Sequence, residues 1–291
     1  MPELPEVETI KRDLNKSIKG KKILEILYCD TKNLIKEPSF KEFEREIKNK
    51  EIKEIKRRAK NLLFYLSSDK VLLIHLKLTG HLLLVDSKYK IKNSKWTGDN
   101  LPEELKDPRN QFIHLSFLLS DGNQLALSDL RKFAAIRLID KESLANYLSE
   151  YGPEPLEKDF TFEKFKEAIK NRKGPIKKIL MDQSVIAGIG NIYSDEILFE
   201  SGILPARDVK DLSEKELKRI YNSISNVLKK AIKLRGESIS DFRDIKGRLG
   251  RFDRERFVYR REGKPCKKCG TIIERIKIGG RSAHFCPKCQ K

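Results

Sequence analysis

Hydrophobic residues near the start of the chain recur with the period of a helix. Val7, Ile10, Leu14 and Ile18 are three or four residues apart, which places them on one face of an amphipathic helix. Gly20 follows, at a position where a helix C-terminus often has a glycine. The pattern predicts a helix that ends just before Gly20.

The pattern then changes to short apolar runs of the kind that form β-strands. Asp121-Gly122 lies between the last two runs and indicates a hairpin. Several short strands of this kind predict a β-sandwich, and the polar stretch 87–110 predicts a long exposed loop. The predicted strands are Ile23–Tyr28, Leu62–Leu66, Val71–Leu76, His81–Val85, Phe112–Leu119 and Gln124–Leu127.

A Gly-Pro-Glu-Pro segment at 152–155 interrupts the strand pattern and marks a domain boundary. The periodicity beyond it is helical, and the spacing of Ser213 and Glu216 is that of a capping box. Gly236 ends the last helical segment. The predicted helices are Phe162–Lys170, Pro175–Asp182, Ile192–Glu200 and Ser213–Leu234.

These signals predict an α+β protein with four parts. Residues 2–150 form an N-terminal β-sandwich flanked by helices, and residues 151–235 form a helical region. Residues 236–261 are polar, basic and punctuated by glycine, and residues 262–291 form a β-ribbon that carries cysteines.

The cysteines of this ribbon have the spacing of a metal site. Two CxxC pairs, Cys266/Cys269 and Cys286/Cys289, are separated by sixteen residues, and four thiolates can close a tetrahedral Zn²⁺ site. Two disulfides are the alternative, but the unpaired Cys29 and the lack of a secretory signal favour a reducing compartment. Four sulfur ligands leave no open position, so we predict one structural Zn²⁺ ion.

The charge predicts a polyanionic partner. The chain has 62 Lys and Arg against 43 Asp and Glu, a net charge of +19, and residues 230–291 contain nineteen basic and seven acidic residues. A lysine-rich proteome could give the same balance, but the concentration in one region favours nucleic acid. No apolar run is long enough to span a bilayer, so we predict a cytoplasmic protein without membrane contact.

The N-terminus allows two interpretations. Pro2, Glu3 and Glu6 are residues that any helix start prefers. If Met1 is removed, however, Pro2 becomes a secondary α-amine, whose pKa near 8 leaves far more free base at neutral pH than a lysine has. Such an amine can attack a sugar carbon and form an iminium, with Glu3 as general acid and base and Glu6 orienting the amine.

The opening Met-Pro-Glu-Leu-Pro-Glu-Val-Glu-Thr of residues 1–9 closely resembles the start of formamidopyrimidine-DNA glycosylases. Other segments resemble the same family in the same order along essentially the whole chain, which outweighs the ordinary interpretation of the N-terminus. These segments are 57–60 (Arg-Arg-Ala-Lys), 75–78 (His-Leu-Lys-Leu), 129–133 (Asp-Leu-Arg-Lys-Phe), 188–193 (Gly-Ile-Gly-Asn-Ile-Tyr) and 258–266 before the zinc ribbon.

The resemblance implies a helix–two-turns–helix element within 151–235, a loop at 238–252 that covers the extruded base, and roles for individual residues. Pro2 is the Schiff-base nucleophile, Glu3 transfers protons and Glu6 positions the N-terminus. Lys60 contacts a phosphate and supports the lyase step. The DNA-binding residues implied are His75, Leu78, Arg131, Phe133, Asn191 and Arg281. The resemblance places Leu78 in a first intercalation loop and Arg131 and Phe133 in a second, and it implies that these three side chains fill the space left by the flipped base.

The function implied is base-excision repair by a monomer acting on double-stranded DNA. It combines removal of 8-oxoguanine and formamidopyrimidines with AP lyase β,δ-elimination. One rival is the endonuclease VIII-type activity on oxidised pyrimidines, against which Leu4 argues, because that branch typically has glycine there. A second rival is a non-catalytic binder of damaged DNA.

Several positions depart from the family pattern, among them Lys77, Arg260 and the segment 112–114, and three others bear on the intercalation loops. Leu78 stands where methionine is common, Leu130 where proline is usual and Ala134 where glycine is usual. Leucine and methionine are both apolar and similar in volume, so the filling role of Leu78 should persist. The other two changes bear on the stiffness of the second loop and on opposite-base preference.

Overall fold

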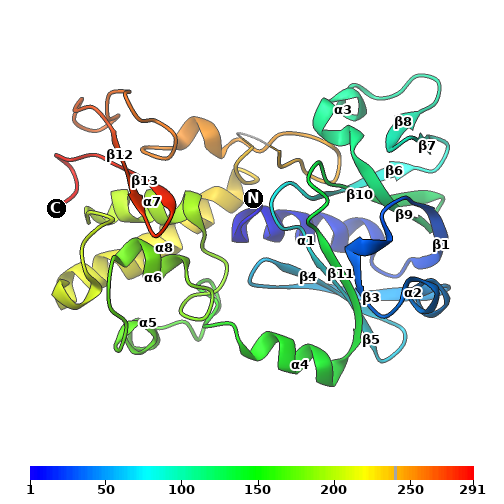
Figure 1. Ribbon diagram of the computed structural model, residues 1–291, viewed down its shortest axis with the longest axis horizontal. Helices are drawn as coiled ribbons and strands as arrows, with labels where there is room; N and C mark the ends of the chain where they lie inside the picture. Colours follow the sequence, from blue (N-terminus) through cyan, green and yellow to red (C-terminus); the bar gives the residue numbers. More distant parts are fainter. Residues whose placement is uncertain (239–240) are drawn as a thin grey trace. The chain divides into compact units, whose positions relative to one another are not determined.

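The computed structural model of the protein describes residues 1–238 and 241–291 (Figure 1). The chain forms two compact units. The first comprises Met1–Leu148 and Leu234–Arg251, and the second comprises Ser149–Lys233 and Phe252–Lys291. The segment after the last long helix therefore returns to the first unit before the chain enters the second unit again.

Helix α1 (Leu4–Ile18) opens the first unit and confirms the predicted helix. The four apolar residues that predicted it have no exposed surface. Pro5 lies in the first turn, where a missing N–H breaks no helical hydrogen bond. Gly20 has a φ of +83°, the left-handed conformation that commonly follows a helix C-terminus.

Nine strands of the first unit form one sheet in the order β2-β11-β5-β4-β3-β1-β9-β10-β6. The six predicted strands, which correspond to β1, β4, β5, β6, β9 and β10, are all present. The strand bounds are β1 (Lys22–Cys29), β2 (Ile35–Glu37), β3 (Lys50–Arg58), β4 (Asn61–Leu66), β5 (Lys70–His75), β6 (His81–Asp86), β9 (Ile113–Leu119), β10 (Asn123–Ser128) and β11 (Ala135–Asp140).

The sheet has two halves that are joined only where β1 pairs with β3, through Lys22↔Glu51 and Ile23↔Lys50. Side chains from both halves share one apolar core with α1 and α2 (Phe40–Ile47). Phe43 of α2 and Phe117 of β9 meet there with ring centroids 6.2 Å apart. The predicted sandwich is thus one continuous sheet around a common core, with α1 packed on β3 and β4 (Figure 1).

Strand β3 was not predicted because its burial does not alternate. Only Ile52 and Ile55 are buried along it, three residues apart, and the pairing with β4 shifts register between Ile52 and Glu54. A bulge of this kind breaks the period of two on which strand prediction depends. Strands β2 and β11 and the helices α2 and α4 (Lys141–Ser149) were likewise not predicted.

The prediction of a long exposed loop at residues 87–110 is wrong. This stretch contains a hairpin of β7 (Lys90–Lys92) and β8 (Lys95–Thr97), followed by α3 (Glu103–Lys106) and a 3₁₀ turn. Trp96 and Leu105 are buried in a second apolar cluster. Apolar residues so widely spaced among polar ones produce no period that the sequence could display.

The four predicted helices of the second unit are present as α5 (Phe162–Ile169), α6 (Ile176–Met181), α7 (Asn191–Ser201) and α8 (Glu214–Lys233). Helix α7 is almost entirely buried and packs against α8. The predicted capping box begins α8, where the Ser213 N–H donates to the Glu216 carboxylate at 2.8 Å.

The predicted β-ribbon is present, with strands β12 (Glu274–Ile278) and β13 (Arg281–Phe285) joined at Gly279 and Gly280. Among residues 1–238 and 241–291, none of the helices combines the length and the hydrophobicity that crossing a membrane requires.

Candidate active site, DNA-binding residues and zinc centre

The first turn of α1 holds two buried carboxylates beside Pro2. Pro2 is buried, and Glu3 and Glu6 are each only 1% exposed. The Glu3 N–H donates to Glu6 Oε2 at 2.7 Å, while the Glu3 side chain accepts from the Glu6 N–H. This reciprocal capping fixes the backbone next to Pro2. Both predicted catalytic carboxylates therefore lie at the helix start.

The second oxygen of Glu6 contacts a distant segment of the same unit. Glu6 Oε1 accepts from the Glu237 N–H at 2.7 Å. Gly236 has a φ of +80°, and a Cβ there would lie 2.6 Å from Glu6 Oε1. The sequence explained Gly236 only as the end of a helix. Its tight approach to Glu6 is a contact that no local pattern could reveal.

Lys60 lies in the connection between β3 and β4 and is 6% exposed. The connection is tied to α1, because Arg57 Nε donates to Glu8 Oε2 at 3.1 Å. The Arg57 guanidinium also donates to the Ala59 carbonyl at 2.9 Å. The turn that carries Lys60 is thus attached to the helix that carries Pro2 and Glu3.

His75 ends β5 and is a neutral side chain. Its Nδ1 accepts from the Lys77 N–H at 2.9 Å. Burial, and then the charges of Lys77 and Lys60, lower the pKa of His75 to about 3. With Nδ1 acting as acceptor, the proton of the neutral ring lies on Nε2. In the protein without DNA, His75 therefore offers a neutral Nε2–H donor.

The two predicted intercalation loops connect strands that pair with one another. Leu78 lies between β5 and β6, and Arg131 and Phe133 lie between β10 and β11. Because β5 pairs with β11 and β6 pairs with β10, both loops lie at one edge. Phe133 is 48% exposed, and the Arg131 guanidinium lies 4.5 Å from its ring centroid.

Asn191 is the first residue of α7, directly after Gly190. Its Oδ1 is buried and has no hydrogen-bond partner among the described residues. The preceding turn is held by Gln183, whose side chain accepts from the Gly188 N–H at 2.9 Å and donates to the Ile189 carbonyl at 2.7 Å. The sequence did not single out Gln183, because a glutamine two turns away carries no motif of its own.

A buried ionic network holds the strand that begins with Arg281. Lys177 of α6 donates to Asp195 of α7 at 2.5 Å and to the Ser282 carbonyl of β13 at 2.6 Å. Asp195 also accepts from His284 Nδ1 at 2.9 Å. The network joins β13 to α6 and α7, so it fixes Arg281 relative to Asn191.

The remaining histidines, which lie within the sheet or the ribbon, each have a side-chain partner, although the buried Nδ1 of His81 has none among the described residues. His81 Nε2 lies 2.8 Å from Asn110 Oδ1, His114 Nδ1 lies 2.8 Å from Asp30 Oδ1, and His284 belongs to the network above. Each is buried.

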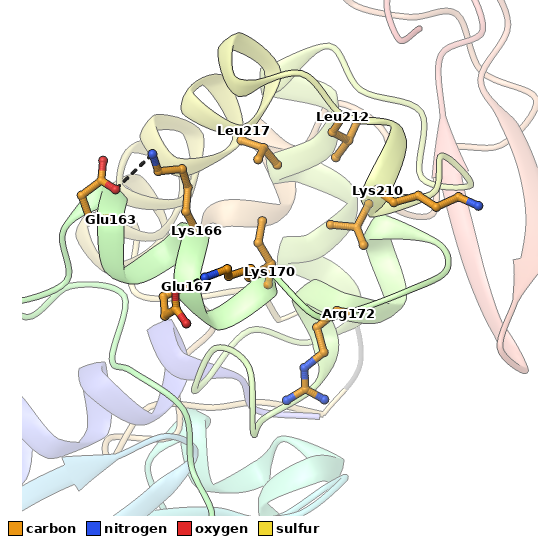
Figure 2. A pocket seen from close by; sticks show the side chains of 10 residues that line it. Glu163, Lys166, Glu167, Lys170, Arg172, Lys210, Leu212 and Leu217 are labelled. Carbon is orange, nitrogen blue, oxygen red and sulfur yellow. Dashed lines mark ion pairs between the residues drawn. The ribbon is translucent and has the colours of Figure 1, made fainter.

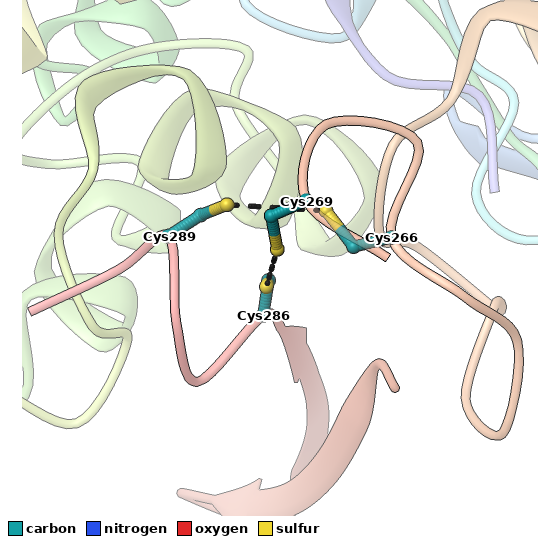
Figure 3. A group of neighbouring side chains, drawn as sticks. All are labelled: Cys266, Cys269, Cys286 and Cys289. Atoms are coloured by element: carbon teal, nitrogen blue, oxygen red, sulfur yellow. Dashed lines mark hydrogen bonds between the residues drawn. The ribbon is translucent and has the colours of Figure 1, made fainter. Parts of the chain in front are cut away.

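The four predicted metal ligands meet in one cluster, whose sulfur atoms all lie within 4.8 Å of one another (Figure 3). The Cys266–Cys289 and Cys269–Cys286 sulfur distances are 3.9 and 3.4 Å. A tetrahedral site with Zn–S bonds of about 2.3 Å requires sulfur atoms roughly 3.8 Å apart, whereas a disulfide requires about 2 Å. The donor set fits one structural zinc ion and excludes the disulfide alternative.

The segment 241–251 of the predicted base-covering loop belongs to the first unit. Phe242 and Ile245 are buried in its core. Asn110 Nδ2 donates to the Gly247 carbonyl at 3.0 Å, and Arg243 Nε donates to Asp107 at 2.8 Å. The composition of this loop, with Gly247, Gly250 and many charged residues, is typical of a mobile lid, but these contacts anchor the described residues 241–251. Residues 239 and 240 of that loop lie outside the described residues.

A surface pocket of about 450 Å³ lies elsewhere in the second unit, between α5, α8 and the segment 209–212 (Figure 2). Its rim is charged, and Lys166 and Glu163 pair across 3.0 Å. None of the predicted catalytic or DNA-binding residues lines it. A binding surface for an extended polymer does not need such a pocket, so we assign it no part in the chemistry.

Comparison with known proteins matches the whole chain. Residues 1–136 match the formamidopyrimidine-DNA glycosylase N-terminal domain, residues 151–243 match the H2TH domain of the same enzymes, and residues 263–291 match the zinc finger found in FPG and IleRS. The formamidopyrimidine-DNA glycosylase of Pelotomaculum thermopropionicum is 39% identical over 100% of this chain and 99% of that protein.

Solved structures give the same result. The Lactococcus lactis Fpg in complex with abasic-site DNA is 34% identical, with a TM-score of 0.86 over 99% of each chain. MutM in complex with DNA containing carbocyclic 8-oxo-G is 35% identical, with a TM-score of 0.85 over 100% of each chain. A complex of the Lactococcus lactis protein with DNA containing an oxidised pyrimidine is 34% identical, with a TM-score of 0.85 over 100% of each chain.

The fold and the sites define a DNA glycosylase class that combines a sheet domain, an H2TH domain and a zinc finger. Within this class, the chain belongs to the formamidopyrimidine-DNA glycosylase family.

Proposed function

We propose that the protein removes oxidised purines, 8-oxoguanine and formamidopyrimidines, from double-stranded DNA and then cleaves the abasic strand. The observation that carries the proposal is the start of α1, where Pro2 adjoins Glu3 and Glu6, two buried glutamates whose carboxylates each accept from the backbone N–H of the other. Family membership supports it, as do the similar structures that contain abasic-site and 8-oxo-G DNA.

The first step uses Pro2 after Met1 has been removed. The freed nitrogen attacks the sugar C1′, and the base leaves with the electron pair of the C1′–N bond and takes up the proton that the Pro2 nitrogen loses. Glu3 gives a proton to the ring oxygen, so the ring opens and C1′ becomes an iminium. Glu6 holds the Glu3 backbone at 2.7 Å and thereby keeps the acid beside the nucleophile.

The iminium then acts as an electron sink for strand cleavage. Loss of a C2′ proton expels the 3′ phosphate in β-elimination, and a second elimination expels the 5′ phosphate. Water hydrolyses the imine, which frees Pro2 and leaves a one-nucleoside gap with phosphate ends. Lys60, on the turn tied to α1, contacts a phosphate and supports this lyase step.

The remaining predicted residues hold the opened duplex. Leu78, Arg131 and Phe133 fill the space left by the flipped base. Phe133 acts as an apolar wedge that stabilises the kinked duplex, and Arg131 faces the unpaired partner base. Phosphates are contacted by neutral His75, by Asn191 at the start of α7 and by Arg281. The loop 238–252 covers the extruded base.

The zinc ion has no part in the reaction, because four thiolates leave it no open position. Reduced thiolates and a genomic substrate support a cytoplasmic, DNA-associated enzyme, and we propose that it acts as a monomer.

Borohydride trapping tests the proposal directly. The processed enzyme should become covalently fixed to lesion-containing duplex DNA in the presence of borohydride. A Pro2→Gly variant, or a form that retains Met1, should give little adduct, because one lacks the secondary amine and the other has Pro2 as an amide. Excision at the normal rate by either form would refute the mechanism, and a protein that binds without any adduct would be a damaged-DNA binder.

Activity on oxidised pyrimidines is the second candidate, favoured by the similar structure whose DNA contains an oxidised pyrimidine. Two matched duplexes separate the candidates, one with 8-oxoguanine opposite C and one with 5-hydroxycytosine opposite G. Faster excision of the purine lesion supports the first proposal, and faster excision of the pyrimidine lesion supports the endonuclease VIII-type activity.

A further inference from the structure

Asp129 is a fully buried carboxylate at the base of the second intercalation loop. Its Oδ2 accepts from the Phe133 and Ala134 N–H groups, both at 2.8 Å. Its Oδ1 accepts from the Arg131 N–H at 3.2 Å. A buried charge is costly unless hydrogen bonds compensate it, and here the donors are the backbone of the loop itself. One side chain thus fixes the path of residues 131–134.

Thr79 connects Asp129 to the first intercalation loop. Its hydroxyl donates to Asp129 Oδ1 and accepts from the Arg131 N–H at 3.1 Å. Thr79 directly follows Leu78 and is itself buried. The two loops therefore share one hydrogen-bonded centre, although they are fifty residues apart in the chain.

The main chain of Asp129 is also hydrogen-bonded to residues outside the two loops. The Asp129 N–H donates to the Phe112 carbonyl at 2.8 Å, and His114 Nε2 lies 3.1 Å from the Asp129 carbonyl oxygen. His114 in turn contacts Asp30 at 2.8 Å. The base of the loop is thereby joined to β9 and to the segment after β1.

The second intercalation loop exposes two apolar side chains to solvent. Leu130 is 41% exposed and Phe133 is 48% exposed. Lys132 has a φ of +55°, which reverses the chain between them. Exposed apolar side chains on a fixed backbone are suited to insertion, because the loop loses little additional freedom when it binds.

We propose that Asp129 and Thr79 are positioning residues that pre-organise both intercalation loops as one rigid wedge before DNA binds. This inference rests on the proposed function, since it assigns the pair to the step in which the damaged base leaves the stack. Both residues are buried, and the hydrogen bonds of their side chains join them to the loop backbone and to each other.

Single-turnover excision by Asp129→Asn and Thr79→Val tests the inference. The asparagine amide places N–H groups against backbone N–H donors, and valine removes the shared hydroxyl while keeping the shape. We expect each variant to excise paired 8-oxoguanine about 10- to 100-fold more slowly. Cleavage at a preformed abasic site, which has no base to extrude, should fall much less. Thr79→Ser should restore the rate.

Asp208→Asn is the matched control. Asp208 also accepts loop N–H groups, from Gly174 and Lys210 at 3.1 Å, but it holds no intercalation loop, so this variant should behave as wild type. Normal excision by Thr79→Val and Asp129→Asn would overturn the inference, as would an equal loss on both substrates. An inactive wild-type protein would instead contradict the proposed function. If Asp129→Asn fails to fold, the two Thr79 variants still decide the question.

Discussion

Glu6 illustrates how one side chain can serve two distant segments. One oxygen caps the first turn of α1 and the other accepts from Glu237, 231 residues away. The carboxylate therefore ties the segment after α8 to the start of the chain. Its position depends on Gly236, which leaves no room for a side chain.

We expect Gly236→Ala to slow base excision by about ten- to a hundredfold, because the new Cβ would displace Glu6 from the position that orients the N-terminus. Gly20→Ala is the matched control. Gly20 has a similar φ of +83°, but nothing lies within 4 Å of its Cβ position. Both substitutions carry the same backbone penalty of about 1 kcal/mol. If Gly236→Ala and Gly20→Ala have equal excision rates, Glu6 does not position the active site.

His81 makes folding stability depend on pH. Burial is the largest cause that lowers its pKa to about 4, whereas in the unfolded chain the pKa is near 6.5. At pH values between these two pKa values, His81 is protonated in the unfolded chain and neutral in the folded protein. Stability is therefore lost as pH falls from about 6.5 to about 4, by up to about 1.4 kcal/mol per pH unit.

His81→Gln should reduce this slope, because glutamine cannot be protonated and its amide can still bond to Asn110. Urea unfolding at pH 7 and pH 5 measures the effect. An unchanged difference between the two pH values would mean that His81 is also protonated in the folded protein.

At the scale of elements, the ribbon depends on both the metal and the ionic network. Its small apolar cluster includes Cys266 and Cys286 beside Phe199, Val258 and Ile273. Glu196 of α7 accepts from the N–H groups of residues 257–259 at 2.8 to 3.0 Å, and burial raises the pKa of this carboxyl. Glu196 thus holds the segment that leads into the ribbon, and the network of Lys177 and Asp195 holds its second strand, β13.

We expect Cys289→Ser to lose the single bound zinc ion and to unfold residues 262–291. Structural zinc sites contribute roughly 10 kcal/mol to small domains, and this cluster is too small to replace that. Zinc content, protease sensitivity of the ribbon and DNA affinity should change together. Cys29→Ser, which lies outside the cluster, should retain the metal. Full DNA affinity in a zinc-free protein would contradict a role for the ribbon in binding.

At the scale of the whole molecule, the net charge of +19 should make DNA binding strongly dependent on salt. Each phosphate contacted by a cation contributes a slope of about −0.9 in log affinity against log salt. The salt dependence of affinity therefore shows which protein–phosphate contacts involve a charged side chain, in addition to how strong each contact is.

Arg281→Gln should weaken binding and reduce the salt slope by about one unit. His75→Gln should weaken binding without changing the slope, because His75, with a pKa of about 3, is neutral. Affinity titrations at several salt concentrations near pH 7 distinguish the two. A reduced slope for His75→Gln would show that DNA binding protonates the ring.

The sequence by itself determined the features that depend on neighbouring residues. The period of α1, six strands, four helices and the capping box of α8 are local patterns, and the CxxC spacing gave the zinc ligands. The motif at residues 1–9 predicts Pro2, Glu3 and Glu6 as catalytic residues, because the chemistry of an N-terminal proline needs little beyond its own helix turn.

Only the tertiary structure decided which distant residues meet. Gly236 against Glu6, Thr79 against Asp129 and Lys177 against Asp195 join residues separated by 18 to 230 positions. The stretch 87–110 and the segment 241–251 are likewise ordered by a few buried side chains that find their partners elsewhere in the same unit. Such contacts depend on strand register and packing, which sequence periodicity does not encode.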